Sequence, residues 1–348
     1  MGNGCSIGPI TGLLKPKYRT IQTFLGENYS PMNGLDVFLD LNTLVDALSG
    51  ATGSSKFMTS LPFSENVEAD IISNLLLTLK HWKDFTRKWS DVRLFMIVND
   101  FEMGGLAEQE VLKAYLAPYI HKFHQDRFKQ FVYYWTESLK RVEVVLKYVP
   151  NAYMIRCNRF DAYVIPEVID DYTKSNSRDR IIVSGSSMFT NYCYMPNAHV
   201  IYTKYKCQLS DPLMICQSIA KIDDDIMKAF TTNRVFYNLL NMIIGDKDRA
   251  IIGLTQIAIT NFAMELMRSV EQRKIPENPK SIEAVLPVVN QNFHDQLRRA
   301  YPLVDISTHA KLVPQSMIEK VKSNMVDLYD IDGLRALNIN GLNLLELL

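Results

Sequence analysis

The chain has 348 residues, and its 38 Lys and Arg residues are balanced by 38 Asp and Glu residues, so the formal net charge is zero. Hydrophobic residues make up 47% and charged residues 22% of the sequence, a composition that excludes a disordered tail protein, a coiled coil and a collagen-like fibre. The neutral total also weighs against a protein that coats nucleic acid through bulk positive charge, although it leaves room for a local basic track.

Short apolar runs alternate with longer amphipathic segments in the first part of the chain. We expect buried strands at the apolar runs, which cover residues 36–41, 94–98, 152–155, 180–184 and 199–202. We expect helices where apolar residues recur every three or four positions, at residues 65–89, 106–148 and 161–173. This alternation predicts an α/β fold with a mainly parallel sheet and helices on both faces.

The same patterns divide the chain into three parts. Residues 1–34 are rich in Gly, Pro and Asn and form an N-terminal extension, and residues 35–205 form the sheet domain. Residues 206–348 form a helical subdomain that ends in an apolar tail, residues 337–348. Since an exposed apolar tail usually docks on something, we expect this tail to bind either the helical subdomain or a groove of a partner.

Carboxylates follow the predicted strands at the positions where parallel sheets collect functional residues. Asp40 ends the first strand, Asp100 follows the second, and Asp161 follows the third at the start of a helix. Three such carboxylates could converge on Mg²⁺ or Mn²⁺, and two ions would allow phosphodiester hydrolysis. The alternative interpretation is that each Asp only caps a following helix.

Several segments occur in an order typical of one superfamily. They are Val37–Asp40, Met96–Asp100, a stretch from Glu137 to Lys204 and Gly245–Asp248. In this order they resemble the PIN-like 5′ nucleases of the flap endonuclease superfamily, most of all the T-even-phage type of RNase H. The resemblance implies a PIN-like fold, a viral origin and a Mg²⁺ or Mn²⁺ site. It implies that Asp40, Asp100, Asp161 and Asp246 stand where the family has acidic residues, with Asp246 opening a helix–three-turn–helix region.

The sequence departs from the family where the family has its remaining metal ligands. Val164 replaces an acid of the third motif, and Ser186 and Met188 replace both acids of the fourth. Serine is a weak neutral ligand and methionine sulfur does not suit Mg²⁺, so we expect at most weak Mg²⁺ or Mn²⁺ binding. The glycines of the family's DNA-binding hairpin are replaced by Gln256 and Ala258.

Basic and aromatic residues are interleaved between residues 113 and 141. A basic groove with aromatic side chains binds single-stranded nucleic acid by charge and stacking, and the resemblance places a helical arch here. The candidate nucleic-acid-binding residues are Lys122, Arg127, Lys129 and Lys140. The alternative is that the aromatic residues form core or a partner interface, because such residues at helical spacing usually pack.

Cysteine usage and targeting signals bear on the compartment. The five cysteines form no C-x-x-C pair, and their odd number favours a reducing compartment over a disulfide framework. No apolar stretch approaches the length of about 20 residues that spans a bilayer. The start Met1–Ser6 fits a myristoylation pattern with Gly2 as acceptor, and the alternative is a flexible terminus.

Three functions are compatible with these patterns. The first is a catalytically degenerate viral relative of the 5′ nucleases that acts as a structural or protein-interaction component, in the host-cell cytoplasm or the virion. The second is a working divalent-metal-dependent 5′–3′ exonuclease, flap endonuclease or RNase H. The third is a nucleic-acid-binding protein that does not cleave. The lost acids, the lost hairpin glycines and the neutral charge favour the first, with other viral or replication proteins as partners and the apolar tail as the contact.

Overall fold

A computed structural model describes residues 29–42, 67–100, 125–158, 161–173, 178–202, 208–209, 224–245, 251–325, 330–336 and 344–347. Its centre is a sheet with the strand order β3-β2-β1-β4-β5-β6, in which the first five strands are parallel and β6 is antiparallel to β5. The strands are β1 (Leu35–Asp40), β2 (Val92–Asn99), β3 (Ala152–Cys157), β4 (Asp179–Ser184), β5 (Ala198–Tyr202) and β6 (Gln208–Leu209). The predicted α/β class and mainly parallel sheet are confirmed.

Helices cover both faces of this sheet, because alternate strand residues point to opposite sides. In β1, Val37 and Leu39 lie in the hydrophobic cluster with α3 (Val67–Thr86) and α5 (Gln125–Leu146). Phe38 lies in the opposite cluster, with α6 (Ile165–Thr173), α12 (Ile306–His309) and α13 (Gln315–Asn324). Continuous apolar strands therefore reflect burial on both sides, as parallel sheets require.

The direction of the strand order reverses between β1 and β4. From β1 the chain proceeds outward through β2 and β3, and it then returns to pair β4 with the other edge of β1. Parallel α/β sheets form a crevice at the carboxyl ends of the strands beside such a reversal. The fold therefore directs attention to the ends of β1 and β4.

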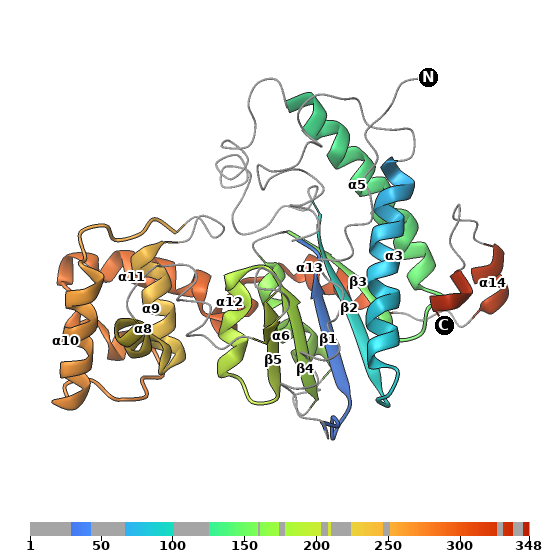
Figure 1. Cartoon of the computed structure of the whole chain (residues 1–348). Helices are drawn as coiled ribbons and strands as arrows, with labels where there is room; N and C mark the ends of the chain where they lie inside the picture. The colour runs from blue at the N-terminus through green and yellow to red at the C-terminus, as the bar shows by residue number, and fades with distance from the viewer. Residues whose placement is uncertain are drawn as a thin grey trace.

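The helices of the C-terminal part build a second hydrophobic core. This core comprises α8 (Asp224–Thr231), α9 (Arg234–Ile244), α10 (Ile259–Glu271) and α11 (His294–Val304), which lie together at one end of the molecule (Figure 1). The shorter helical segments are η4 (Ala162–Val164), η5 (Ser187–Tyr194), η8 (Ile282–Ala284), η9 (Leu286–Val288), η10 (Gln291–Phe293), η11 (Ala310–Leu312), α14 (Ile331–Ala336) and η12 (Leu344–Leu347). None of the described helices is long and apolar enough to cross a membrane.

After α11 the chain returns to the sheet domain. Ile306 of α12 and Met317 of α13 join the core on one face of the sheet. The amide of Asn324 at the end of α13 donates to the carbonyl of Met154 in β3 at 3.0 Å. The C-terminal part thus both forms its own core and supplies two helices to the sheet.

The described part of the apolar tail docks on the sheet domain. Leu344 and Leu347 of η12 are buried in the cluster formed by α3 and α5, and Lys83 of α3 donates to the carbonyl of Leu347. Figure 1 shows α14 and η12 beside α3 and α5, far from the α8–α11 group. The expectation that the tail binds the helical subdomain or a partner groove is wrong for these residues, because their apolar side chains complete the core of another part of the same chain. Residues 337–343 and 348 lie outside the described residues.

Because η12 completes this core, shortening its buried side chains should destabilise the sheet domain. We expect Leu347→Ala to lower the free energy of unfolding by about 2–5 kcal/mol, the usual cost of truncating a buried leucine. Leu312→Ala is the matched control, because Leu312 is 43% exposed and should change stability by less than about 0.5 kcal/mol. Equal effects in urea denaturation would show that η12 is not part of the core.

Candidate functional site

Asp40 lies at the reversal point of the sheet, where β1 and β4 end side by side. Its Oδ2 accepts a hydrogen bond from the hydroxyl of Ser184 at 2.5 Å, and its Oδ1 accepts from the side-chain and backbone amides of Asn42 at 2.7 and 3.1 Å. The Ser184 hydroxyl in turn accepts from the backbone amide of Ser186 at 2.9 Å. Both oxygens of this buried carboxylate are therefore engaged by neutral donors of the chain.

Asp100 follows β2 and is neutralised by two cations. Its Oδ2 accepts from two guanidinium nitrogens of Arg156, Nε at 3.0 Å and NH2 at 2.9 Å, and from the ammonium of Lys320 at 3.3 Å. Arg156 belongs to β3 and also pairs with Glu143 of α5 at 3.2 Å, whereas Lys320 comes from α13. Asp100 is only 2% exposed, and a carboxylate this deeply buried needs such partners to stay charged.

Asp161 lies in the turn after β3 and pairs with a histidine of α12. The backbone amide of Asp161 donates to the side-chain oxygen of Asn158 at 2.9 Å, and the Asn158 amide donates back to Asp161 Oδ2. The other carboxylate oxygen lies 2.7 Å from His309 Nε2. The ring of His309 meets that of Tyr163 edge to face with centroids 5.1 Å apart, and both His309 and Asp161 are buried.

The charges of the three carboxylates all act on one buried thiol, that of Cys157 at the end of β3. Burial raises the pKa of this thiol well above its ordinary value, and the negative charges of Asp161, Asp40 and Asp100 raise the pKa further. The three acids follow the carboxyl ends of β1, β2 and β3. The sequence correctly places these acids at one edge of the sheet.

The positions where the family has further acids supply no ligand here. Val164 and Met188 are buried in the apolar cluster that includes Phe189. Ser186 caps η5 by accepting the backbone amide of Met188 at 3.3 Å. Among the described residues, no group of three His, Cys, Asp or Glu side chains is arranged to hold a metal ion. Both oxygens of Asp40, both of Asp161 and Oδ2 of Asp100 lie within hydrogen-bond distance of donors of the chain, so a divalent ion would compete with these partners.

The predicted nucleic-acid-binding residues are only partly described. Lys122 lies outside the described residues, as do the side chains of Arg127 and Lys129. Asp246, the fourth predicted acid, also lies outside them. Lys140 is about half exposed and donates to Glu137 at 2.7 Å, one helical turn away. Its assignment to nucleic acid stays a prediction.

Two aromatic residues of the same helix belong to the core. Phe131 and Trp135 are fully buried, and the indole of Trp135 donates to the carbonyl of Asn99 at 2.8 Å. Tyr133 is 62% exposed. The packing interpretation therefore holds for the two buried residues, and they offer no stacking surface.

Gly245 and Gly253, which follow α9, lie where two backbone segments come close together. Gly245 has φ +85°, and a Cβ on Gly253 would lie 2.3 Å from the carbonyl oxygen of Ile244. The amide of Leu254 donates to the carbonyl of Ile243 at 2.7 Å across this close approach. Only glycine fits between the two backbones, so contact within the chain accounts for its presence.

Sequence reasoning missed the residues that neutralise the acids. Arg156 interrupts an otherwise apolar strand, and this was a visible signal because a buried arginine needs a carboxylate partner. Lys320 and His309 carry no such signal, because each lies on an ordinary amphipathic segment far along the chain from its partner.

The strand order and its reversal point define an α/β protein. Its carboxylates lie at the carboxyl ends of the strands, the edge at which this fold class places its active sites. No protein-family model matches the sequence, and no curated protein sequence is significantly similar to it. Among solved structures, the chain is similar to a flap endonuclease and a 5′-exonuclease.

Both of these neighbours are proteins of bacteriophage T5. One is a flap endonuclease in a pseudo-enzyme–product complex with DNA and metal ions, with 12% identity and a TM-score of 0.48, covering 86% of this chain and 99% of its own. The other is a 5′-exonuclease with bound zinc, with 13% identity and a TM-score of 0.49, covering 85% of this chain and 100% of its own.

Neutralising an acid of this cluster should destabilise the protein. Asp100→Asn leaves Arg156 and Lys320 without their buried anion, so we expect the free energy of unfolding to fall by about 1.5–3 kcal/mol, the value of a hydrogen bond to a charged group. A cluster of unneutralised acids would behave in the opposite way, because removing one charge would relieve repulsion between the others.

Asp295→Asn is the control, because the Asp295 side chain is 86% exposed and such surface pairs contribute little. Urea denaturation without divalent ions measures both variants. A more stable Asp100→Asn protein would contradict the paired arrangement.

Proposed function

We propose that this protein is a catalytically degenerate viral relative of the 5′ nucleases that acts as a structural or protein-interaction component rather than as an enzyme. The observation that carries the proposal is that Asp40, Asp100 and Asp161 each accept hydrogen bonds or ion pairs from donors of their own chain. Arg156 and Lys320 supply the positive charge that metal ions would supply in a working site.

The electrostatics of Asp100 support this proposal. Two unit charges 4 Å apart interact by about 4 kcal/mol at the dielectric typical of a protein surface, and a divalent ion doubles this. A metal ion on Asp100 would therefore be repelled by Arg156 and Lys320, or would have to displace both. The chemistry of two-metal hydrolysis needs two ions about 4 Å apart, and Ser186, Met188 and Val164 add no charge to hold the second.

Two other functions remain as outcomes of the test. One is a divalent-metal-dependent 5′ nuclease or RNase H with a reduced ligand set, and the other is a nucleic-acid-binding protein without cleavage. A location in the host-cell cytoplasm or the virion and partners among viral or replication proteins remain part of the proposal.

A cleavage assay tests the proposal. We expect no turnover of 5′-flap DNA or of RNA–DNA hybrids with Mg²⁺ or Mn²⁺, and the same background from the wild type and Asp40→Ala. Turnover that disappears in Asp40→Ala would establish the nuclease instead. Salt-dependent retention on single-stranded DNA without cleavage would establish the nucleic-acid-binding alternative.

Removing a cation and restoring an acid should create metal binding. We expect Ser186→Asp combined with Lys320→Gln to bind Mn²⁺ by calorimetry, whereas the wild type does not, because aspartate both caps a helix and adds a carboxylate beside Asp40. The control replaces Lys320→Gln by Lys322→Gln on the same helix, where Lys322 lies over the ring of Tyr172. Equal Mn²⁺ binding in both double variants would show that Lys320 does not block the site.

A further inference from the structure

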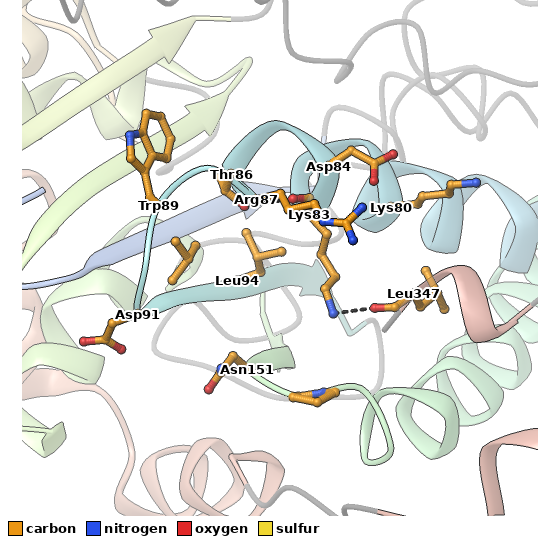
Figure 2. A pocket seen from close by; sticks show the side chains of 12 residues that line it. Lys80, Lys83, Asp84, Thr86, Arg87, Trp89, Asp91, Leu94, Asn151 and Leu347 are labelled. Carbon is orange, nitrogen blue, oxygen red and sulfur yellow. Dashed lines mark hydrogen bonds between the residues drawn. The ribbon is translucent and has the colours of Figure 1, made fainter. Parts of the chain in front are cut away.

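A polar cavity lies at the amino edge of the sheet, opposite the edge that carries Asp40, Asp100 and Asp161. It has a volume of about 800 Å³ and is formed by the last turn of α3, the turn into β2, the residues before β3 and the tail residue Leu347 (Figure 2). We call it the α3 cavity. Val92 begins β2 and Asn99 ends it, so the length of this strand separates the cavity from the acids by about 20 Å.

Positive charge predominates in the lining of the α3 cavity. Lys80, Lys83 and Arg87 lie three or four residues apart along α3 and its continuation, on one face. The carboxylates in the lining are Asp84 and Asp91. Asp91 is already paired with Arg178, which also donates to its backbone carbonyl at 2.7 Å. Basic residues in the last turn of a helix are favoured by the helix dipole alone. The dipole does not explain why these residues line a cavity.

Lys83 reaches across this cavity. Figure 2 shows its side chain extending from α3 to the carbonyl of Leu347, which accepts one of its hydrogen bonds. An ammonium group has three donors, and the carbonyl of Leu347 is the acceptor for one of them among the described residues. Burial lowers the pKa of Lys83, although the charge of Asp84 opposes this effect. A bound anion would compensate the lost hydration of the ammonium group.

Arg87 provides the second cation. It follows Lys83 by four positions, is exposed to solvent, and forms no salt bridge with any residue that the structure describes. Its guanidinium has five donors in a rigid fork that matches the oxygens of carboxylates and phosphates. Like charges at this spacing repel each other, so an anion between Arg87 and Lys83 would be favoured by both.

We propose that the α3 cavity binds a small ligand carrying a phosphoryl group, held between Lys83 and Arg87. A carboxylate has two oxygens and is satisfied by Arg87 alone, whereas a phosphoryl group has three and can engage both cations. The cavity volume is within the range of about 300–1,000 Å³ typical of small-molecule sites. This inference does not depend on the proposed function, because it concerns the other edge of the sheet.

Titration calorimetry of the full chain with pyrophosphate tests the proposal. We expect one pyrophosphate per chain and a loss of affinity of at least about tenfold in Arg87→Gln, since a charge-assisted contact is removed. Lys83→Gln should weaken binding similarly, and circular dichroism checks its fold because Lys83 also supports the tail. Arg87 is exposed, so Arg87→Gln tests the site even where Lys83→Gln does not fold.

Lys88→Gln is the matched control. It removes the same charge one residue away, but Lys88 lies over the ring of Trp89, 4.5 Å from its centroid, and does not line the cavity. We expect its affinity to change by less than about twofold. Absence of pyrophosphate binding, or equal losses in Lys88→Gln and Arg87→Gln, would overturn the proposal.

Citrate distinguishes the phosphoryl group from other anions. We expect citrate to bind at least about tenfold more weakly than pyrophosphate, because its carboxylates cannot bridge both cations with one group. Citrate binding of equal strength that is also lost in Arg87→Gln would show an unselective anion site. Single-stranded DNA that competes with pyrophosphate at equal phosphate concentration would show that the site belongs to a nucleic-acid surface, and this too would overturn the proposal.

Discussion

The arrangement of the molecule depends on the cost of burying carboxylates. An ionised carboxylate taken out of water loses several kcal/mol unless cations or hydrogen-bond donors replace its hydration. Asp100 and Asp161 are almost completely buried, and their partners Lys320 and His309 come from two helices of the C-terminal part. These pairs help to fix α13 and α12 against the sheet, so the acid cluster now positions elements of the fold.

A buried carboxylate at the other end of the sheet, Asp36, is also paired with two cations. Asp36, near the amino end of β1, is fully buried; Arg93 donates to both of its oxygens, and Arg178 donates to Oδ1 at 2.8 Å. Asp100 between Arg156 and Lys320 repeats this arrangement of one carboxylate and two cations at the carboxyl edge. A metal site leaves carboxylate oxygens available to the ion. Asp100, in contrast, is paired with cationic side chains of the chain, as Asp36 is. This parallel indicates that the acids contribute to stability.

Local patterns predicted the sheet because each strand is an apolar run that ends in a carboxylate or another polar residue. The positions of Asp40, Asp100 and Asp161 follow from the same rule, since the ends of parallel strands share an edge. Their partners could not be predicted, because Lys320 lies 220 residues from Asp100 and His309 lies 148 residues from Asp161. The docking of Leu347 on α3 could not be predicted from the sequence either. The apolar composition of the tail predicts that it is buried, but it does not predict the surface that covers it.

The structure shows how the positive and negative charges behind the zero net charge are paired. Arginines and lysines around the sheet are largely matched with acids: Arg156 with Asp100, Lys140 with Glu137, and Arg141 with Glu68. Charge matched within the chain attracts phosphate only weakly, so these particular arginines and lysines contribute little to the positive field that nucleic-acid binding requires. Donors with few partners among the described residues lie instead at the amino edge, on Lys83 and Arg87. This pairing favours anion binding at the amino edge of the sheet, away from Asp40, Asp100 and Asp161.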